Sequence, residues 1–110
     1  MTATTTVIIP NYNGMKFLEP CLKALQAQTY QNFKILVVDN GSTDGSAQWL
    51  EERGIDTIFL KENTGFSGAV NTGIRAADTP YVILLNNDTE ADEYYVAEMV
   101  RAIERSLKIF

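Results

Sequence analysis

Ile83-Leu84-Leu85-Asn86-Asn87-Asp88 is an apolar run that ends abruptly in two amides and a carboxylate. The residues from Tyr81 to Leu85 are aromatic, β-branched or aliphatic, and the run is too short for an independent helix, so it predicts a buried strand. In an open α/β sheet, the carboxyl ends of the strands border the ligand crevice. Oxygen donors at such an end suit a hard divalent cation that bridges to a phosphate.

Apolar strands alternate with helical patterns along the chain. Strands are predicted over 6–9, 33–38, 57–60 and 81–85, with Pro10 stopping the first because proline cannot donate to a sheet ladder. A first helix carries apolar residues at three- and four-residue spacing, namely Phe17, Leu18, Cys21, Leu22 and Leu25. Pro20 either marks its first turn or kinks it. The other helices are one capped by 42–44 and ended by Gly54, one over 65–77 and one over 92–107, whose apolar face is Val96, Met99, Val100, Ile103 and Leu107.

This alternation predicts one α/β domain with a Rossmann-like, open, mostly parallel sheet and helices on both faces. Ligands bind such a sheet where the strand order reverses. With the third and second strands on one side of the first strand and the fourth on the other, the crevice opens between strands one and four. Its lining is then the polar strand ends, Pro10-Asn11-Tyr12-Asn13, Asp39-Asn40 and Asn86-Asn87-Asp88.

Composition excludes several classes of function. The net charge is −5 with no basic run, which argues against nucleic acid or an anionic membrane surface as the main partner. No apolar stretch approaches the length of a membrane span, and residues 1–6 lack a secretory signal pattern, so a cytoplasmic location is expected. The chain has no histidine, which excludes histidine-based zinc sites and leaves the single cysteine, Cys21, without an imidazole base.

Four motifs, in order over nearly the whole chain, resemble family 2 glycosyltransferases, and the rhamnosyltransferase-like members most closely. They are Ile9-Pro-Asn-Tyr-Asn-Gly14, Val37-Val-Asp-Asn-Gly-Ser-Thr-Asp-Gly45, Asn63-Thr-Gly-Phe-Ser-Gly-Ala-Val-Asn-Thr-Gly-Ile74 and Leu84-Leu-Asn-Asn-Asp-Thr89. The resemblance implies a GT-A fold, a UDP- or dTDP-sugar donor, Mg²⁺ or Mn²⁺, and transfer with inversion to a saccharide or lipid-linked acceptor. It also implies that residues 1–110 are the nucleotide-sugar-binding N-terminal half of a truncated domain. The catalytic base then comes from the other half, and no catalytic residue is assigned.

The resemblance also implies roles for individual residues. It places the pyrimidine base and the ribose near Pro10, Asn11, Tyr12 and Asp39, with the Asp39 carboxylate accepting a hydrogen bond from the ring N–H. The other interpretation of Asp39 is that it caps its own turn at 40–42, and Asn-rich loops are often turn formers.

The donor-binding set implied by the resemblance further includes Asn63, Gly65, Asn71, Asn86 and Asn87. Small residues at 65–68 let the backbone approach a nucleotide, although close packing of the helix on the sheet explains Gly68 and Gly73 equally well. Phe66, Trp49 and the pair Tyr94-Tyr95 are expected to be packing residues.

The stretch Asn86-Asn87-Asp88 corresponds to the family's metal motif, in which two aspartates flank a variable residue. Asn86 replaces the first aspartate, so Asp88 is the one carboxylate expected to meet the cation. When the site is empty, Asp39 and Asp88 are both expected to be solvated at the rim of the sheet. Neutralising either one should then cost the fold little.

Other functions remain open. A non-catalytic nucleotide-binding or interaction module is the main alternative, because a free-standing half-domain can bind a nucleotide without transferring a sugar. A phospho-receiver domain and a sugar nucleotidyltransferase fit less well, since the loop after the first strand has neither an acidic pair nor a basic glycine-rich sequence. In the GT-A arrangement that the resemblance implies, the outer edge of the strand 81–85 is unpaired and the apolar face of the helix 92–107 is partly uncovered. This predicts a homodimer through the strand edge or the helix.

Overall fold

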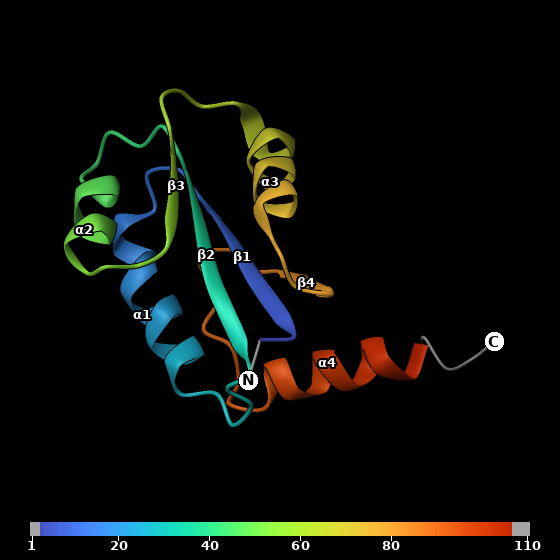
Figure 1. Ribbon diagram of the computed structural model, residues 1–110. Coiled ribbons are helices and arrows are strands. Elements are labelled where there is room, and N and C mark those ends of the chain that lie inside the picture. The colour runs from blue at the N-terminus through green and yellow to red at the C-terminus, as the bar shows by residue number, and fades with distance from the viewer. Residues whose placement is uncertain (1–2, 107–110) are drawn as a thin grey trace.

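The structure, a computed structural model, describes residues 3–106 and has the predicted alternation of strands and helices (Figure 1). The elements in chain order are β1 (Thr5–Asn11), α1 (Met15–Gln26), β2 (Phe33–Asn40), α2 (Ser46–Glu52), β3 (Thr57–Leu60), α3 (Gly65–Ala76), β4 (Tyr81–Leu84) and α4 (Tyr95–Ser106). The predicted α/β class is therefore confirmed. Among the described residues, no helix is both long enough and apolar enough to span a bilayer.

The strands form one parallel sheet in the order β3-β2-β1-β4. Thr5 of β1 lies opposite both Phe33 of β2 and Tyr81 of β4, so β1 is the central strand of these three. The second and third strands lie on one side of β1 and the fourth on the other, which is the arrangement on which the predicted position of the crevice depends. The strand order reverses at β1, and this places the ligand crevice of an open α/β sheet beyond the carboxyl ends of β1 and β4.

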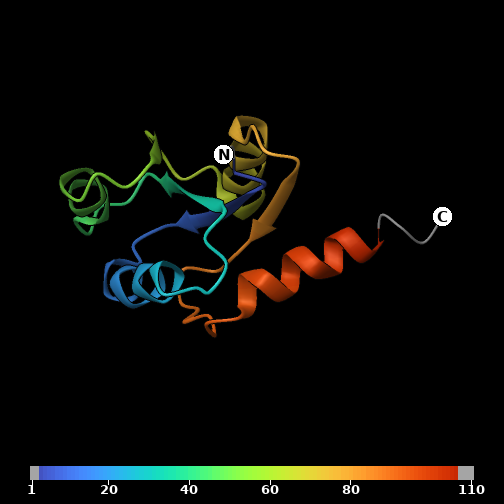
Figure 2. The ribbon, with the colours of Figure 1, turned by 60° about the horizontal axis from the view of Figure 1, so that its bottom comes forward.

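Helices cover both faces of the sheet. Because side chains alternate along a strand, Val7 and Ile9 point to one face, whereas Ile8 points to the other. The first face packs against α1, α2 and α4, and its buried residues include Leu18, Leu22, Leu25, Leu50, Val96 and Val100. On the second face Ile8 and Val38 pack against Ala69 of α3. Figures 1 and 2 show α3 across the sheet from α1 and α2.

Gly73 lets α3 lie close to the sheet. A Cβ atom at this position would lie 2.6 Å from Cγ2 of Ile8 and 3.2 Å from Cγ2 of Val38. Close helix–sheet packing, one of the two interpretations open from the sequence, is thus confirmed at Gly73. At Gly68 the neighbour is different, since a Cβ there would meet Oγ1 of Thr64, at the start of the same helix, at 2.6 Å.

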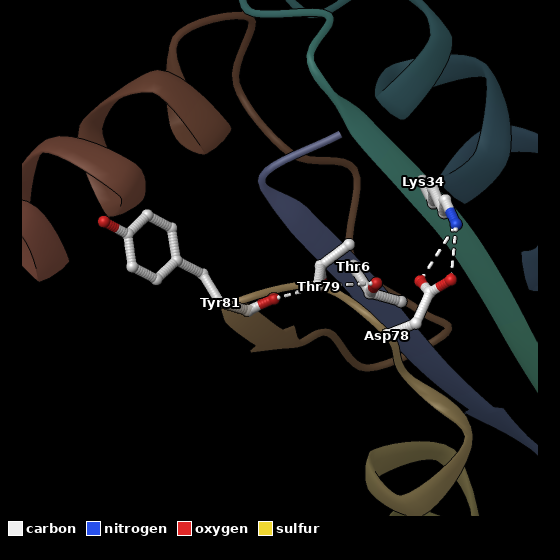
Figure 3. A network of polar contacts seen from close by, with 5 residues as sticks. All are labelled: Thr6, Lys34, Asp78, Thr79 and Tyr81. Atoms are coloured by element: carbon white, nitrogen blue, oxygen red, sulfur yellow. Dashed lines mark hydrogen bonds and ion pairs between the residues drawn. The ribbon is translucent and has the colours of Figure 1, made fainter. Parts of the chain in front are cut away.

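Polar side chains connect the strands at the amino-terminal end of the sheet, opposite the crevice (Figure 3). The Thr6 and Thr79 hydroxyl oxygens are 2.7 Å apart, and the Thr79 hydroxyl donates to the Tyr81 carbonyl at 2.8 Å. Lys34 and Asp78 form an exposed ion pair at 2.9 Å. The ammonium group of Lys34 donates to the Asp78 carboxylate and lowers the pKa of that carboxyl. These contacts tie the segment before β4 to β1 and β2, which fixes where β4 begins.

Three of the four strands have boundaries that differ from the prediction, and β1 begins one residue earlier, at Thr5. β1 continues through Pro10 to Asn11 and pairs with β2 along this whole length. Pro10 is tolerated because its nitrogen faces β4, and the ladder between β1 and β4 ends earlier, at Ile8 opposite Leu84. β2 extends to Asn40, where it still pairs with β3. β4 ends at Leu84, although the Leu85 N–H still donates to the Ile8 carbonyl at 2.9 Å.

The helix boundaries also differ. Pro20 lies inside α1 and not in its first turn. α2 begins at Ser46 after Gly45, and Asp44 accepts a hydrogen bond from the Ser46 N–H at 3.0 Å, so the predicted cap at 42–44 lies one residue too early. α3 ends at Ala76.

α4 begins at Tyr95, whereas the sequence predicted 92. Asp92 forms a turn in which its carboxylate accepts the Tyr94 N–H at 3.0 Å. The buried side chain of Gln28 accepts the Val96 N–H at 2.9 Å and thereby satisfies the start of the helix. α4 then extends away from the sheet in both views (Figures 1 and 2). Val96 and Val100 of its predicted apolar face are buried and Met99 is exposed, while Leu107 lies outside the described residues.

Candidate functional site

A cleft of about 300 Å³ lies at the carboxyl ends of the strands, at the predicted crevice. Its lining comes from the last residues of β1 and β2 and from the segments that follow β1, β3 and β4. The lining residues are Pro10, Asn11, Tyr12, Asn40, Asn63, Phe66, Asn86, Asn87 and Asp88.

Asn11 is the centre of the hydrogen-bond network beneath the cleft. Its side chain is 1% exposed. The amide nitrogen donates to Oδ1 of Asp39 at 3.0 Å and to Oγ of Ser42 at 3.3 Å, while Oδ1 accepts from the Asn87 amide at 2.8 Å. One side chain therefore links the ends of β1, β2 and β4, and the floor of the cleft is held rigid.

Asp39 is buried, and the expectation that it is solvated was wrong. It is 2% exposed and does not line the cleft. Besides the bond from Asn11, its carboxylate accepts the Ser42 hydroxyl at 2.7 Å and the Ser42 N–H at 3.2 Å. Three of its roughly four lone-pair positions are thus occupied. The physical reason is that β2 continues to Asn40, which draws Asp39 into the sheet. Its role as acceptor for a base N–H stays a prediction.

The loops after β1 and β2 are joined to each other. Asn13 has a φ of 52°, its N–H donates to Oγ of Ser42 at 2.9 Å, and its own Oδ1 accepts the Thr43 N–H at 2.7 Å. Across this loop pair the Met15 N–H donates to Asp44 at 3.0 Å. Asn13 therefore acts as a turn former, and it is not among the lining residues.

The start of α3 is bound to the end of β2 through Asn40. The Asn40 amide nitrogen donates to Oδ1 of Asn63 at 3.0 Å and to the Gly65 carbonyl at 3.1 Å, and its Oδ1 accepts the Thr64 N–H at 2.9 Å. Gly65 thus lies behind the cleft as part of the turn. Phe66 follows it and lines the cleft with 59% of its surface exposed. The expectation that Phe66 is a packing residue was therefore wrong.

Asn86, Asn87 and Asp88 form the opposite end of the cleft, after β4. They turn back on themselves, since the Thr89 N–H donates to the Asn86 carbonyl at 3.1 Å. Asp88 and Asn86 are exposed, and within residues 3–106 no cluster of three His, Cys, Asp or Glu side chains is present. The donor set is therefore one carboxylate and neighbouring amide oxygens. This chemistry fits a hard cation only where phosphate oxygens complete its coordination.

The structure brings seven of the ten predicted site residues to one cleft. These are Pro10, Asn11, Tyr12, Asn63, Asn86, Asn87 and Asp88. Asp39 and Gly65 support the lining from behind. Asn71 does not reach the cleft, because it lies between Ala69 and Gly73, both buried against the sheet, and so faces solvent on the other side of α3.

Cys21 lies under the cleft and is chemically protected. It is 1% exposed, and its thiol points to the Asn86 carbonyl at a sulfur–oxygen distance of 3.9 Å. Burial, followed by the negative charges of Asp88 and Glu90, raises the pKa of the thiol to about 11. The thiolate is the reactive form, so Cys21 is no nucleophile, in agreement with the absence of histidine.

Comparison with known proteins agrees with this geometry. The family described as Glycosyl transferase family 2 matches residues 6–110. Glycosyltransferase GlyA of Streptococcus pneumoniae serotype 4 is 37% identical over 102 residues, which cover 89% of this chain and 15% of GlyA.

Two solved structures share the fold. S. aureus TarS in complex with UDP superposes with a TM-score of 0.81 at 25% identity, over 96% of this chain and 32% of that one. The mannosyltransferase PcManGT from Pyrobaculum calidifontis, in complex with GDP-Man and Mn²⁺, gives 0.80 at 27% identity, over 92% of this chain and 32% of that one. The chain spans about a third or less of the length of each of these proteins. The parallel sheet is that of GT-A glycosyltransferases, the cleft lies where its strand order reverses, and the family match runs over almost the whole sequence: the chain belongs to glycosyl transferase family 2.

Proposed function

We propose that this chain is the donor-binding part of a glycosyltransferase that takes a UDP- or dTDP-sugar. The observation that carries the proposal is the cleft at the strand-order reversal, which has aromatic and amide groups at one end and Asp88 at the other. A nucleoside diphosphate has the matching polarity, with a flat base at one end and an anionic diphosphate at the other. TarS, a neighbour in fold, has been solved with UDP.

Base recognition is assigned to the end of the cleft near β1 and β2. Pro10 and Tyr12 offer apolar surface, and Tyr12 is 48% exposed. Asn63 lines the same cleft with an amide able to read a base edge. We assign the remaining lone-pair position of Asp39 to a pyrimidine N–H that would reach this buried carboxylate past the lining residues. This is the part of the proposal that requires a uracil or thymine base.

The diphosphate is assigned to the end of the cleft near β4. Asp88 and the oxygen of Asn86 would hold a Mg²⁺ or Mn²⁺ ion, which, when bound, neutralises the charge of the leaving diphosphate. Asn87 is already oriented by its bond to Asn11. PcManGT, which shares the fold, has been solved with Mn²⁺.

Transfer to an acceptor hydroxyl with inversion requires a general base on the far side of the sugar. Asp88 is the one carboxylate among the lining residues that the structure describes, and it is assigned to the cation. We therefore expect the base and the site for a saccharide or lipid-linked acceptor to lie outside residues 1–110. The same observation favours the second candidate, a module that binds nucleotide without transferring a sugar. The cytoplasmic location stays a prediction.

Self-association is part of the proposal. β4 is an edge strand of the sheet, Leu84 is 42% exposed, and Met99 of α4 is 37% exposed. An apolar strand edge without lysine or proline is a template for pairing with another copy. A homodimer through this edge would cover it.

Titration calorimetry tests the nucleotide site. UDP, dTDP, ADP and GDP are titrated into the chain with Mg²⁺, with Mn²⁺, and with a chelator. We expect UDP and dTDP to bind more tightly than the purine nucleotides, and both to weaken when the metal is removed. Affinity will be modest, because the nucleotide loses translational and rotational freedom on binding. Equal heats for all four nucleotides would exclude pyrimidine recognition, and no heat for any would exclude the site.

A further inference from the structure

Phe66 is the most exposed large apolar side chain in the cleft. Its exposed fraction is 59%, compared with 48% for Tyr12, the other aromatic residue of the lining. Single exposed apolar residues are ordinary on a protein surface. Phe66 differs because it is exposed inside a concave site that otherwise consists largely of amides and a carboxylate. An aromatic ring there provides apolar surface that a flat ligand group can cover.

Asn40, the last residue of β2, fixes the position of the turn that leads into Phe66. Asn40 is 4% exposed, and all of its hydrogen-bonding capacity is used within the three residues that precede Phe66. Its nitrogen donates to Asn63 Oδ1 and the Gly65 carbonyl, and its oxygen accepts the Thr64 N–H and the Thr64 hydroxyl, both at 2.9 Å. The backbone that leads into Phe66 is therefore already ordered before a ligand arrives, which favours binding.

The arrangement of the lining gives the cleft a direction. Phe66 enters from the segment after β3, and Asp88 from the segment after β4, and these two strands are the opposite edges of the sheet. The segments that carry Phe66 and Asp88 are thus separated by the ends of β2 and β1, which contribute Asn40 and Asn11 to the lining. A ligand with an aromatic group and an anionic group fits in one orientation, with the aromatic group toward Phe66.

We propose that Phe66 is a specificity-determining residue that contacts the nucleobase, and that Asn40 is a positioning residue that holds the turn 63–65 so that Phe66 faces it. This inference rests on the proposed nucleotide site. It assigns to α3 a direct part in reading the base, in addition to the segments after β1 and β2. Replacing an aromatic residue that contacts a base with alanine weakens binding about 5- to 100-fold.

The test compares Phe66→Ala with the wild-type chain and with Phe59→Ala. Phe59 is a matched control because it is 44% exposed, lies on β3 and does not line the cleft. UDP with Mg²⁺ is the probe. Calorimetry gives its dissociation constant, and saturation-transfer NMR compares the uracil protons with the ribose protons of the same bound molecule. We expect Phe66→Ala to raise the dissociation constant about tenfold and to lower the uracil signal relative to the ribose signal. Phe59→Ala should change neither.

The positioning role is tested in a double-mutant cycle. Asn40→Ala should weaken UDP binding in the wild-type background and have little further effect beside Phe66→Ala, because the side chain that it positions is then absent. A thermal melt first checks that Asn40→Ala folds. If it does not, Thr64→Val replaces it, since that change removes only the hydroxyl bonded to Asn40, and Thr64→Ser is its control.

The outcomes separate this inference from the proposed function. If the wild-type chain binds UDP and Phe66→Ala binds it equally well with an unchanged uracil signal, the contact with Phe66 is overturned and the nucleotide site stands. If the Asn40 or Thr64 effect is absent or fully additive, the positioning role is overturned. If the wild-type chain does not bind UDP at all, the proposed function fails and this inference fails with it.

Discussion

The side-chain amide of Asn87 donates a 2.8 Å hydrogen bond to Oδ1 of Asn11, which joins the end of β4 to the end of β1 across a sequence separation of 76 residues. This bond crosses the sheet at the place where the strand order reverses. Asn11 continues the connection to Asp39 on β2. The cleft therefore has a floor of linked polar side chains in place of three independent loop ends. A substitution in one loop should alter the hydrogen bonds of the others.

Gly14→Ala should break this bond. A Cβ atom at Gly14 would lie 2.1 Å from Nδ2 of Asn87 and 2.6 Å from Oδ1 of Asn11, whereas the φ of −103° suits any residue. We expect a loss of about 1–3 kcal/mol of stability from overpacking, together with weaker UDP binding. Denaturant unfolding and calorimetry measure the two effects. Asn87→Ala is the companion variant, since it removes the nearer obstacle, so adding Gly14→Ala to it should cost less than Gly14→Ala alone. A Gly14→Ala chain as stable as the wild type would contradict this packing.

Asp88→Asn should abolish the metal dependence of UDP binding with less than about 0.5 kcal/mol change in stability, as for an ordinary surface substitution. Asp88 is exposed, so the folded chain does not depend on its charge, but a cation would lose its one anionic protein ligand. Titrations with Mn²⁺ and with a chelator give the metal dependence, and a thermal melt gives the stability. Glu90→Gln is the matched control, because it removes an exposed charge two residues away outside the cleft lining. Metal dependence that survives in Asp88→Asn would remove this residue from the proposal.

Asp39→Asn should behave differently from Asp88→Asn, because Asp39 is buried. An amide in its place turns one oxygen into a donor, which then faces the donors on Asn11 and Ser42. We expect about 1–3 kcal/mol of lost stability, since a buried polar group without its partner bears the full desolvation cost. Base recognition should weaken even without metal. Unfolding curves and metal-free UDP titration measure both, with Ser42→Ala as a variant that removes one hydroxyl partner and leaves the carboxylate. An unchanged preference for UDP over GDP in a folded Asp39→Asn chain would leave Asp39 with a structural role only.

The sequence was sufficient for the four strands, for their parallel arrangement and for most of the cleft. Apolar runs that end in Asn and Asp mark the strand ends, and right-handed crossovers leave few ways to arrange four parallel strands. Asn86, Asn87 and Asp88 therefore lie where they were predicted, beside Pro10 and Asn11. Their positions follow from local pattern and topology alone.

The misplaced residues depend on contacts between distant segments, which a local pattern does not contain. Asp39 is buried because β3 pairs as far as Asn40, and Phe66 is exposed because Asn40 fixes the turn before it. Likewise Gln28, distant in sequence, satisfies the start of α4 and so moves its first residue to Tyr95. In each case a buried amide or a strand pairing decided the outcome against local propensity.

The stability of the chain should fall as the pH rises from about 9 to 11 because of Cys21. In the unfolded chain the thiol ionises near its ordinary pKa of 9.0, but burial and the charges of Asp88 and Glu90 raise the pKa to about 11 in the folded chain. Below pH 9 both states hold the proton, so the contribution is fully present, and it is lost as the pH passes the folded value. The loss should reach about 2–3 kcal/mol. Urea unfolding at several pH values measures it, and the Cys21→Ala chain should lack this component. Parallel curves for the two chains would show that the thiol is not protected.

The last prediction concerns the open edge of β4. Leu84 is 42% exposed on a strand whose outer edge has no partner among the described strands, and α4 extends away from the sheet instead of covering it (Figure 2). We expect the 110-residue chain to form dimers, and Leu84→Lys to shift it toward monomers, because a charged side chain on an edge strand opposes pairing. Phe59→Lys on β3 is the matched control, since β3 is the other edge of the sheet and Phe59 is 44% exposed. Light scattering over a range of concentrations measures the dimer. Release of UDP from a UDP-sugar in the presence of an acceptor measures transfer, which we expect to be absent.

A monomer at all concentrations would contradict pairing through β4. Equal effects of Leu84→Lys and Phe59→Lys would assign association to general apolar exposure, and acceptor-dependent release of UDP would place a catalytic base within these 110 residues.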